Sequence, residues 1–156
     1  MIIMTRINSA IPVRCLTDEH LLAEHREIKR LPFCLHEAIR TGSVKCIPER
    51  FVLGKGHVKF FLNKMLFCRK RYRSIYVELH LRHFHVENYE ENFVYGVPDE
   101  YQGYYTPTDE ERRLLINRIT DRIMHSRKQT WHYYGQPISK EAAVRLLMGN
   151  EVSETI

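Results

Sequence analysis

The chain has 156 residues, and 24 Lys and Arg against 19 Asp and Glu give a formal charge of +5. That length predicts one domain. With 44% hydrophobic and 28% charged residues, the composition is that of a globular protein and excludes a mainly disordered chain. No apolar run approaches the roughly 18 residues of a membrane helix, and the patch at residues 1–4 is too short for a signal peptide. We therefore expect a cytoplasmic protein without a membrane partner, whose basic body favours a polyanion, nucleic acid first.

Cysteine and histidine spacing offers little for a metal ion. The cysteines form no C-x-x-C pair and show no regular spacing, which predicts reduced, mostly buried thiols and neither a zinc site nor a disulfide framework. They are Cys15, Cys34, Cys46 and Cys68. The histidines of the ELHLRHFH run, His80, His83 and His85, have no carboxylate or thiol at ligand spacing. No metal site is expected there.

The first predicted helix covers residues 17–31. Thr17 is a suitable N-cap, and acidic residues follow it at the positive end of the helix dipole. Pro32 interrupts the pattern. The stretch 33–40 then either continues the helix beyond a kink or forms a separate turn before Gly42.

A long amphipathic helix is predicted from Val58 to about His83, because apolar residues recur there at intervals of three and four. A third helix begins at the capping box TDEE after Thr108 and runs to about Arg127. A short fourth helix fits residues 139–149. The connections between them show little strand alternation. The sequence thus predicts an all-α, compact single domain of three main helices with long loops and a short extra C-terminal helix.

One stripe of the first helix carries groups that could transfer protons. His20, Glu24 and Glu27 share this stripe at spacings of four and three, with Arg26 and Arg30 beside it. Carboxylates at the edge of a core, close to cations, can act as general acids or bases. The same spacing also suits a salt-bridged helix surface, and the sequence alone leaves both interpretations open.

Basic residues are concentrated on the second and third predicted helices. The second carries Lys59, Lys64, Arg69, Lys70, Arg71 and Arg73. On the third, Arg118 and Arg122 lie four residues apart, and the helix leads into the aromatic segment WHYYG at 131–135. Such a pattern can bind phosphates and stack on bases. A solvated helix face with an aromatic lid on the core explains the same residues.

Five strings in order resemble one known family. They are TRIN at 5–8, DEHLLAEHREIKRLP at 18–32, FVLGKGHVKFFLNKMLFCRKR at 51–71, DEYQGYYTP at 99–107 and WHYYG at 131–135. Together they resemble the pyrimidine dimer DNA glycosylase (endonuclease V) family typified by the T-even phage repair enzyme. The resemblance is collinear from Thr5 to about Ile138. It implies a compact helical domain that removes cyclobutane pyrimidine dimers from double-stranded DNA and nicks the abasic strand, without metal or other cofactor.

The family's catalytic groups fall on two positions of this chain. Its nucleophile is the α-amine of an N-terminal threonine, which the resemblance places at Thr5, and its essential glutamate falls on Glu27. An α-amine has a reference pKa of about 7.7–8.0, against about 10.4 for lysine, so much of it is neutral at physiological pH. Attack on the sugar would give an iminium that also permits β-elimination.

The resemblance also implies which side chains contact DNA. The phosphate-binding arginines near the lesion correspond to Arg6, Arg26 and Arg30, and basic positions of the last large helix correspond to Arg118 and Arg122. His20 falls beside the first cluster. The aromatic residues near the damaged strand correspond to Trp131, Tyr133 and Tyr134.

Both ends of the chain depart from this pattern. The sequence begins MIIMTRIN, so translation from Met1 would place the Thr5 amine inside a peptide bond, whereas a start at Met4 with removal of that methionine would free it. Residues 1–4 are therefore expected to be untranslated or removed from the glycosylase-like domain at 1–138. Residues 139–156 are expected to be an appended helix and tail. The protein is expected to be a monomer, and retention of residues 1–4 would instead give a non-catalytic DNA-binding protein of the same fold.

Overall fold

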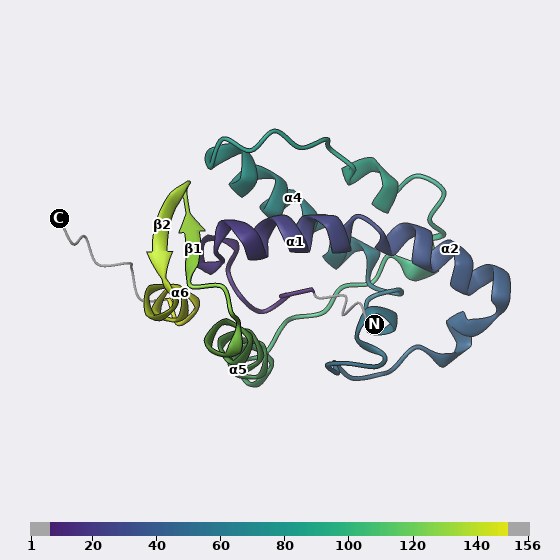
Figure 1. Cartoon of the computed structure of the whole chain (residues 1–156). Helices are drawn as coiled ribbons and strands as arrows, with labels where there is room; N and C mark the ends of the chain where they lie inside the picture. Colours follow the sequence, from purple (N-terminus) through teal and green to yellow (C-terminus); the bar gives the residue numbers. More distant parts are fainter. Residues whose placement is uncertain (1–6, 150–156) are drawn as a thin grey trace.

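The computed structural model describes residues 7–149, in which helices surround one hydrophobic core and a two-stranded antiparallel sheet lies at one end (Figure 1). The helices are α1 (Asp18–Ile28), α2 (Leu31–Thr41), α3 (His57–Phe60), α4 (Met65–Leu81), α5 (Asp109–His125) and α6 (Lys140–Leu147). The strands are β1 (Thr130–Tyr133) and β2 (Gln136–Ser139). The expected helical fold is confirmed in its main part, and the sheet corrects the prediction that the fold is purely α.

The first predicted helix is confirmed as α1, and the stretch that follows it forms a separate helix, α2. The Thr17 hydroxyl accepts a hydrogen bond from the His20 backbone N–H at 3.1 Å and so caps α1. Pro32 lies in the first turn of α2, where a missing N–H does no harm. Gly42, with φ of 81°, ends α2 in the left-handed conformation. The stretch after Pro32 is thus a separate helix rather than a kinked continuation.

The single helix expected from Val58 to about His83 is wrong, because residues 61–64 form a turn between α3 and α4. A distant segment enters the helical hydrogen-bond ladder at this point. The Gly103 N–H donates to the Asn63 carbonyl at 3.1 Å, and the Phe67 N–H donates to the Gly103 carbonyl at 3.2 Å. A Cβ at position 103 would lie 2.3 Å from the Asn63 oxygen, so glycine is needed there.

The last two helices begin where the sequence predicts. The Thr108 hydroxyl accepts from the Glu111 N–H at 3.1 Å, and the Ser139 hydroxyl accepts from the Ala142 N–H at 3.1 Å. The short helix α6 packs against α5 through fully buried residues such as Leu147.

The sheet was missed because its turn does not have a usual hairpin sequence. Tyr134 and Gly135 have φ values of 52° and 78°, which are typical of a two-residue type I′ turn. Tyrosine is uncommon in that conformation. The Asp18 carboxylate stabilises the turn by accepting from the N–H groups of Tyr134, at 3.0 Å, and Gly135, at 2.8 Å.

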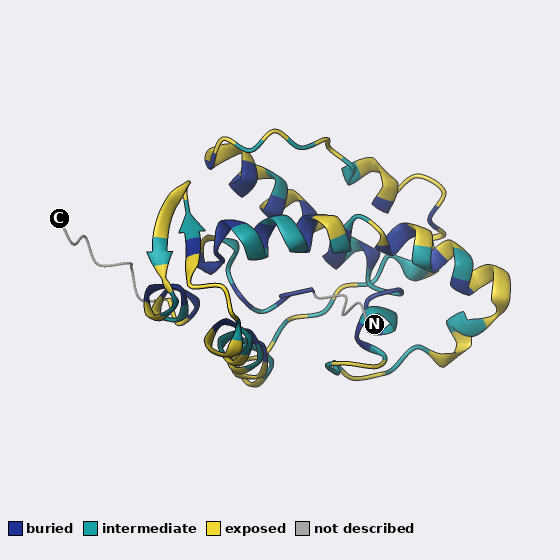
Figure 2. Ribbon diagram, viewed as in Figure 1, coloured by how far each residue is buried: buried dark blue, intermediate teal, exposed yellow. Residues whose placement is uncertain are grey.

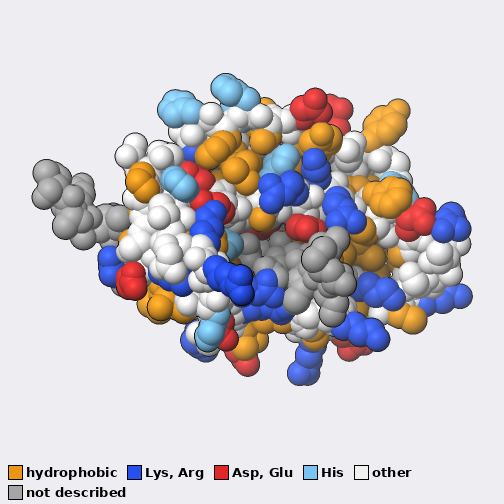
Figure 3. Space-filling model, in the orientation of Figure 1, with side chains coloured by type: hydrophobic (Ala, Val, Ile, Leu, Met, Phe, Trp, Pro, Cys, Tyr) orange, Lys and Arg blue, Asp and Glu red, His pale blue; other side chains and the backbone are white. Residues whose placement is uncertain are grey.

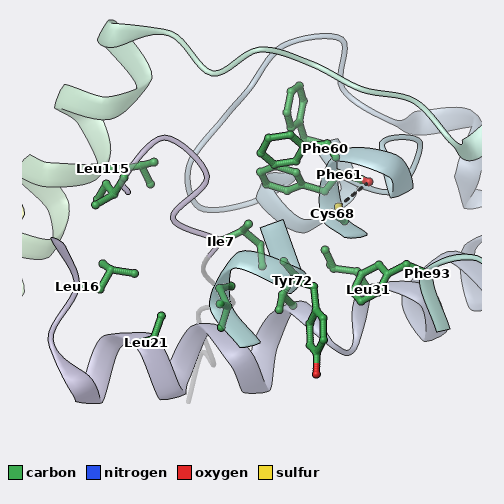
Figure 4. Packing of buried hydrophobic residues seen from close by; sticks show 14 of the residues in the cluster. Ile7, Leu16, Leu21, Leu31, Phe60, Phe61, Cys68, Tyr72, Phe93 and Leu115 are labelled. Atoms are coloured by element: carbon green, nitrogen blue, oxygen red, sulfur yellow. Dashed lines mark hydrogen bonds between the residues drawn. The ribbon is translucent and has the colours of Figure 1, made fainter. Parts of the chain in front are cut away.

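The core lies mainly between α1, α4 and the N-terminal segment at residues 7–16 (Figure 2). Among its largest fully buried side chains are Ile7, Phe61, Tyr72 and Phe93, which Figure 4 shows at close range. Cys15 and Cys68 are buried, whereas Cys34 is half-buried and Cys46 exposed, and all four are free thiols. Burial raises the pKa of the Cys68 thiol. Within residues 7–149, no helix is long and apolar enough to span a bilayer.

Candidate functional site

The segment at residues 7–17, which leads into α1, is held by side chains rather than by a strand or long helix. It runs alongside α1 in Figures 1 and 4. Arg71 donates to the Ile11 carbonyl at 2.6 Å, and Arg82 donates to the carbonyls of Val13, at 3.2 Å, and Leu16, at 2.7 Å. These bonds give the carbonyls of this irregular segment donors from side chains at the other side of the core. The backbone of this segment is therefore fixed against the rest of the fold.

Thr5 and Arg6, for which the resemblance implies roles in catalysis and in phosphate binding, lie outside the described residues. Ile7 is the first described residue, and its side chain is fully buried. Its backbone N–H donates to Nε2 of His57 at 3.0 Å. The two candidate residues are thus joined to a point that is anchored by both backbone and side chain.

The two glutamates of the predicted stripe on α1 have different surroundings. Both oxygens of Glu24 accept from Arg71, at 2.7 and 2.9 Å, and both side chains are almost completely buried. The Glu24 side chain is fully buried, and the bidentate pair fixes it in the core. Glu24 is therefore a structural residue.

Glu27 has the features of a reactive carboxylate. Its side chain is 19% exposed, and Nη1 of Arg30 lies 3.6 Å from Oε2. That oxygen is shielded from solvent and has no hydrogen-bond partner among the residues from 7 to 149. A buried carboxylate oxygen without a donor is unfavourable unless a ligand supplies one. Of the two acids, Glu27 is the one that can act on a bound molecule.

The described arginines that are expected to bind phosphate lie on α1 and α5 and at the junction of α1 with α2. Arg26 is exposed on α1 and Arg30 is exposed at the N-cap of α2, whereas Arg118 and Arg122 are half-buried on α5. Arg118 lines a small cavity together with Asn8 and His57, which places it beside the N-terminal segment. Burial lowers the pKa of Arg122, although an arginine stays charged in proteins. Lys and Arg side chains are spread across the middle of the face that carries α1 and α5 (Figure 3).

Most cations of the second predicted helix have partners within the protein, which favours a structural role over phosphate binding for them. Arg71 is paired with Glu24, and Arg69 and Arg73 both bind Glu90. The Lys64 amine donates to the Phe60 carbonyl at 2.8 Å, and partial burial lowers its pKa. The helical pattern alone could not show which cations meet an acid from another segment.

His20 and Trp131 form a stacked pair where β1 contacts α1. Their ring centroids are 5.0 Å apart, with an angle of 10° between the planes. Lys128 covers the indole, with Nζ 4.9 Å from the ring centroid. Nδ1 of His20 lies 2.7 Å from the Thr17 hydroxyl, and burial lowers the pKa of His20 to about 4. The imidazole is therefore neutral at pH 7.

Tyr133 and Tyr134 attach the hairpin to the rest of the fold. The Tyr133 hydroxyl donates to the Arg14 carbonyl, and the Tyr134 hydroxyl donates to Glu78, each at 2.8 Å. The guanidinium of Arg82 lies 4.6 and 4.9 Å from the two ring centroids. Both tyrosines thus have structural partners, and their contact with DNA stays a prediction.

Sequence reasoning did not identify His57, Arg82 and Asp18, which hold the site in place. Each is buried and polar, and each contacts a segment distant in sequence. Burial of a polar residue is the signal, and it appears only once the chain is folded. Among the described residues, no group of three or more His, Cys, Asp or Glu could hold a metal ion.

A comparison with protein families agrees with this arrangement. The model of the family described as pyrimidine dimer DNA glycosylase matches residues 4–91, which is more than half of the chain. The match includes the start of the N-terminal segment, all of α1 and the α4 helix that holds both, and it ends before α5. The chain belongs to the pyrimidine dimer DNA glycosylase family.

Proposed function

We propose that the protein is a glycosylase and abasic-site lyase that acts on UV-induced cyclobutane pyrimidine dimers in double-stranded DNA. The observation that carries this proposal is that the family match includes Thr5 and Glu27, while Glu27 alone of the two acids has an oxygen without a donor among residues 7–149. The nucleophile is the α-amine of Thr5, freed by removal of the residues before it. The protein acts as a monomer in the cytoplasm, without a cofactor.

One amine serves both chemical steps. The Thr5 nitrogen attacks C1′ of the damaged nucleotide, and the bond from C1′ to the base breaks with its electron pair leaving on the base. Opening of the sugar ring, with a proton to the ring oxygen, gives an iminium between the amine and C1′. The iminium acidifies C2′, and loss of a C2′ proton expels the 3′ phosphate by β-elimination.

Glu27 stabilises the cationic sugar and moves protons during ring opening and elimination. Oε2 of its carboxylate is shielded from solvent, so negative charge on that oxygen is less screened than on a surface acid. Arg30, at 3.6 Å, keeps a positive charge beside it. The donor that Oε2 lacks among the described residues is supplied by the substrate complex.

Arginines on and just after α1, and on α5, position the duplex, while the lesion supplies specificity. Arg26 on α1 and Arg30 at the start of α2, with Arg6, contact phosphates near the lesion, and Arg118 and Arg122 contact phosphates from α5. The stacked pair of His20 and Trp131 lies at the start of α1, next to this surface. A damaged step is weakly stacked and is therefore less costly to open.

The proposal is tested by trapping the iminium. Protein is incubated with dimer-containing duplex and borohydride, and the adduct is located by mass spectrometry after the intact mass has established the first residue. We expect the adduct at Thr5 of a protein that begins at Thr5. An adduct on a lysine, or none from protein shown to begin at Thr5, would refute the mechanism.

A protein that retains residues 1–4 would be the alternative, a non-catalytic DNA-binding protein of the same fold. The proposal and the alternative differ in the intact mass and in the trapped adduct, since both predict binding to duplex DNA. Glu27→Gln separates chemistry from binding in the active form. We expect it to bind damaged duplex normally and to cleave about 10²- to 10⁴-fold more slowly.

A further inference from the structure

His57 has a fixed protonation state that the surrounding backbone imposes. Its Nδ1 lies 2.8 Å from the Val52 carbonyl, which can only accept, so Nδ1 carries a proton. Its Nε2 lies 3.0 Å from the Ile7 N–H, which can only donate, so Nε2 carries none. The ring is therefore the neutral Nδ1–H tautomer, and it links the loop before α3 to the first described residue.

The surroundings of His57 keep it neutral and immobile. The ring is 3% exposed and meets the rings of Phe51 and Phe61 edge to face, at centroid distances of 5.4 and 5.2 Å. Burial is the main cause that lowers the pKa of His57, and the positive charge of Arg118 on α5 acts in the same direction. Glu24 on α1 opposes this shift.

The anchored nitrogen of Ile7 limits where the proposed nucleophile can lie. One residue spans at most about 3.6 Å of chain, so the amine of residue 5 lies within about 7 Å of the Ile7 nitrogen. If that nitrogen is not fixed, the amine samples a larger volume. A nucleophile displaced by about 1 Å can lose on the order of 10²-fold in rate.

We propose that His57 is a positioning residue, whose Nε2 holds the Ile7 N–H so that the amine of Thr5 is directed at the sugar. The inference rests on the proposed function, because the hydrogen bond between His57 and Ile7 matters for catalysis only if the Thr5 amine is the nucleophile. His57 itself does not touch the substrate.

Two substitutions at this position separate anchoring from packing. In His57→Gln the amide oxygen reaches the place of Nε2 and can accept from Ile7. In His57→Asn the shorter amide corresponds to Nδ1, so it can donate to Val52 but leaves the Ile7 N–H without a partner. Both variants lose the imidazole contacts with Phe51 and Phe61, so they are matched in lost packing.

The test measures single-turnover formation of the borohydride-trapped adduct on abasic-site duplex, with protein that begins at Thr5. We expect His57→Asn to form adduct on the order of 10²-fold more slowly than wild type, with His57→Gln within a few-fold of wild type and undamaged-duplex binding the same in all three. Hydrogen exchange should show the Ile7 amide protected in His57→Gln and unprotected in His57→Asn. Leu79→Ala, which alters the core in α4, controls for loss of stability alone and should keep the adduct rate at temperatures where it is folded.

The outcomes distinguish the two proposals. Wild-type protein that begins at Thr5 yet forms no adduct would refute the proposed function, and the role of His57 with it. Adduct from wild type, with equal rates in His57→Asn and His57→Gln, would refute only the role of His57. A loss of rate in Leu79→Ala as large as in His57→Asn would show that His57 acts merely through stability. If His57→Gln does not fold, His57→Asn against Leu79→Ala still decides between anchoring and stability.

Discussion

Replacing Glu24 by glutamine should destabilise the protein strongly, whereas the same replacement at Glu27, one helical turn further along α1, should not. Glutamine keeps the shape of the side chain and removes only the charge. At position 24 it leaves the Arg71 guanidinium buried and without a counterion, since the Arg71 side chain is only 7% exposed and its other hydrogen bond is to the neutral Ile11 carbonyl. Among residues 7–149, Glu27 has only the looser pair with the exposed Arg30, at 3.6 Å.

The magnitudes follow from burial. Removing one partner of a buried ion pair costs about 3–5 kcal/mol, and in a domain of this size each kcal/mol shifts Tm by roughly 2–4 °C. Glu24→Gln should therefore lower Tm by about 6–20 °C. A partly exposed pair contributes about 0–1 kcal/mol, so Glu27→Gln should lower Tm by less than about 4 °C.

Thermal melts followed by circular dichroism, with urea unfolding as a second measure, give the comparison. The double change Glu24→Gln with Arg71→Met is the control: it removes the unpaired charge and should be more stable than Glu24→Gln alone. If Glu24→Gln melts within about 2 °C of wild type, or if Glu27→Gln is the less stable of the two, the assignment of one structural and one catalytic acid is wrong.

Three further predictions concern DNA binding, pH and the turn before α4. Arg122→Ala should weaken binding to damaged and undamaged duplex alike and flatten the salt dependence of log K by about 0.9 per log unit of salt, and a loss confined to damaged duplex would contradict a positioning role. Burial lowers the pKa of His20 to about 4, so the His20 imidazole of the unfolded chain takes up a proton first as the pH falls below about 6.5. Urea unfolding should therefore show a free energy of unfolding that decreases from about pH 6.5 toward about pH 4, and an increase would contradict the burial of His20. Gly103→Ala should lower stability by about 1–3 kcal/mol, because its Cβ would meet the Asn63 oxygen, while Gly54→Ala meets no atom within 4 Å and should cost less in urea unfolding, despite a strained φ of 73°.

The features that the sequence predicts correctly are local ones. Thr17, Thr108 and Ser139 each begin a helix by accepting from an N–H three residues later, so all the information lies within one turn. The apolar periodicity of α1, α4 and α5 likewise reports one face of a helix. The family resemblance also depends on short sequence strings rather than on packing, and the candidate site residues that it supplies stay predictions.

The features that the sequence does not predict depend on contacts between distant segments. The break between α3 and α4 depends on Gly103, some 40 residues further on, while the apolar pattern continues unchanged through the turn. The hairpin depends on Asp18, more than 110 residues away, which stabilises Tyr134 in a conformation that tyrosine rarely adopts. Helical spacing places Glu24 and Glu27 in one stripe, but only the position of Arg71 distinguishes their roles.

The same long-range contacts explain why the protein keeps charges in its core. A buried ion pair can often be replaced by apolar residues without loss of stability, so stability alone does not account for Arg71 and Arg82. Each guanidinium, besides its carboxylate, donates to a carbonyl of residues 11–16, and an apolar side chain could not do so. With His57 at Ile7, these side chains hold the irregular N-terminal segment along its length. The proposed mechanism, with its nucleophile at a chain terminus, requires such an anchor, because a terminus is connected to the fold on one side only.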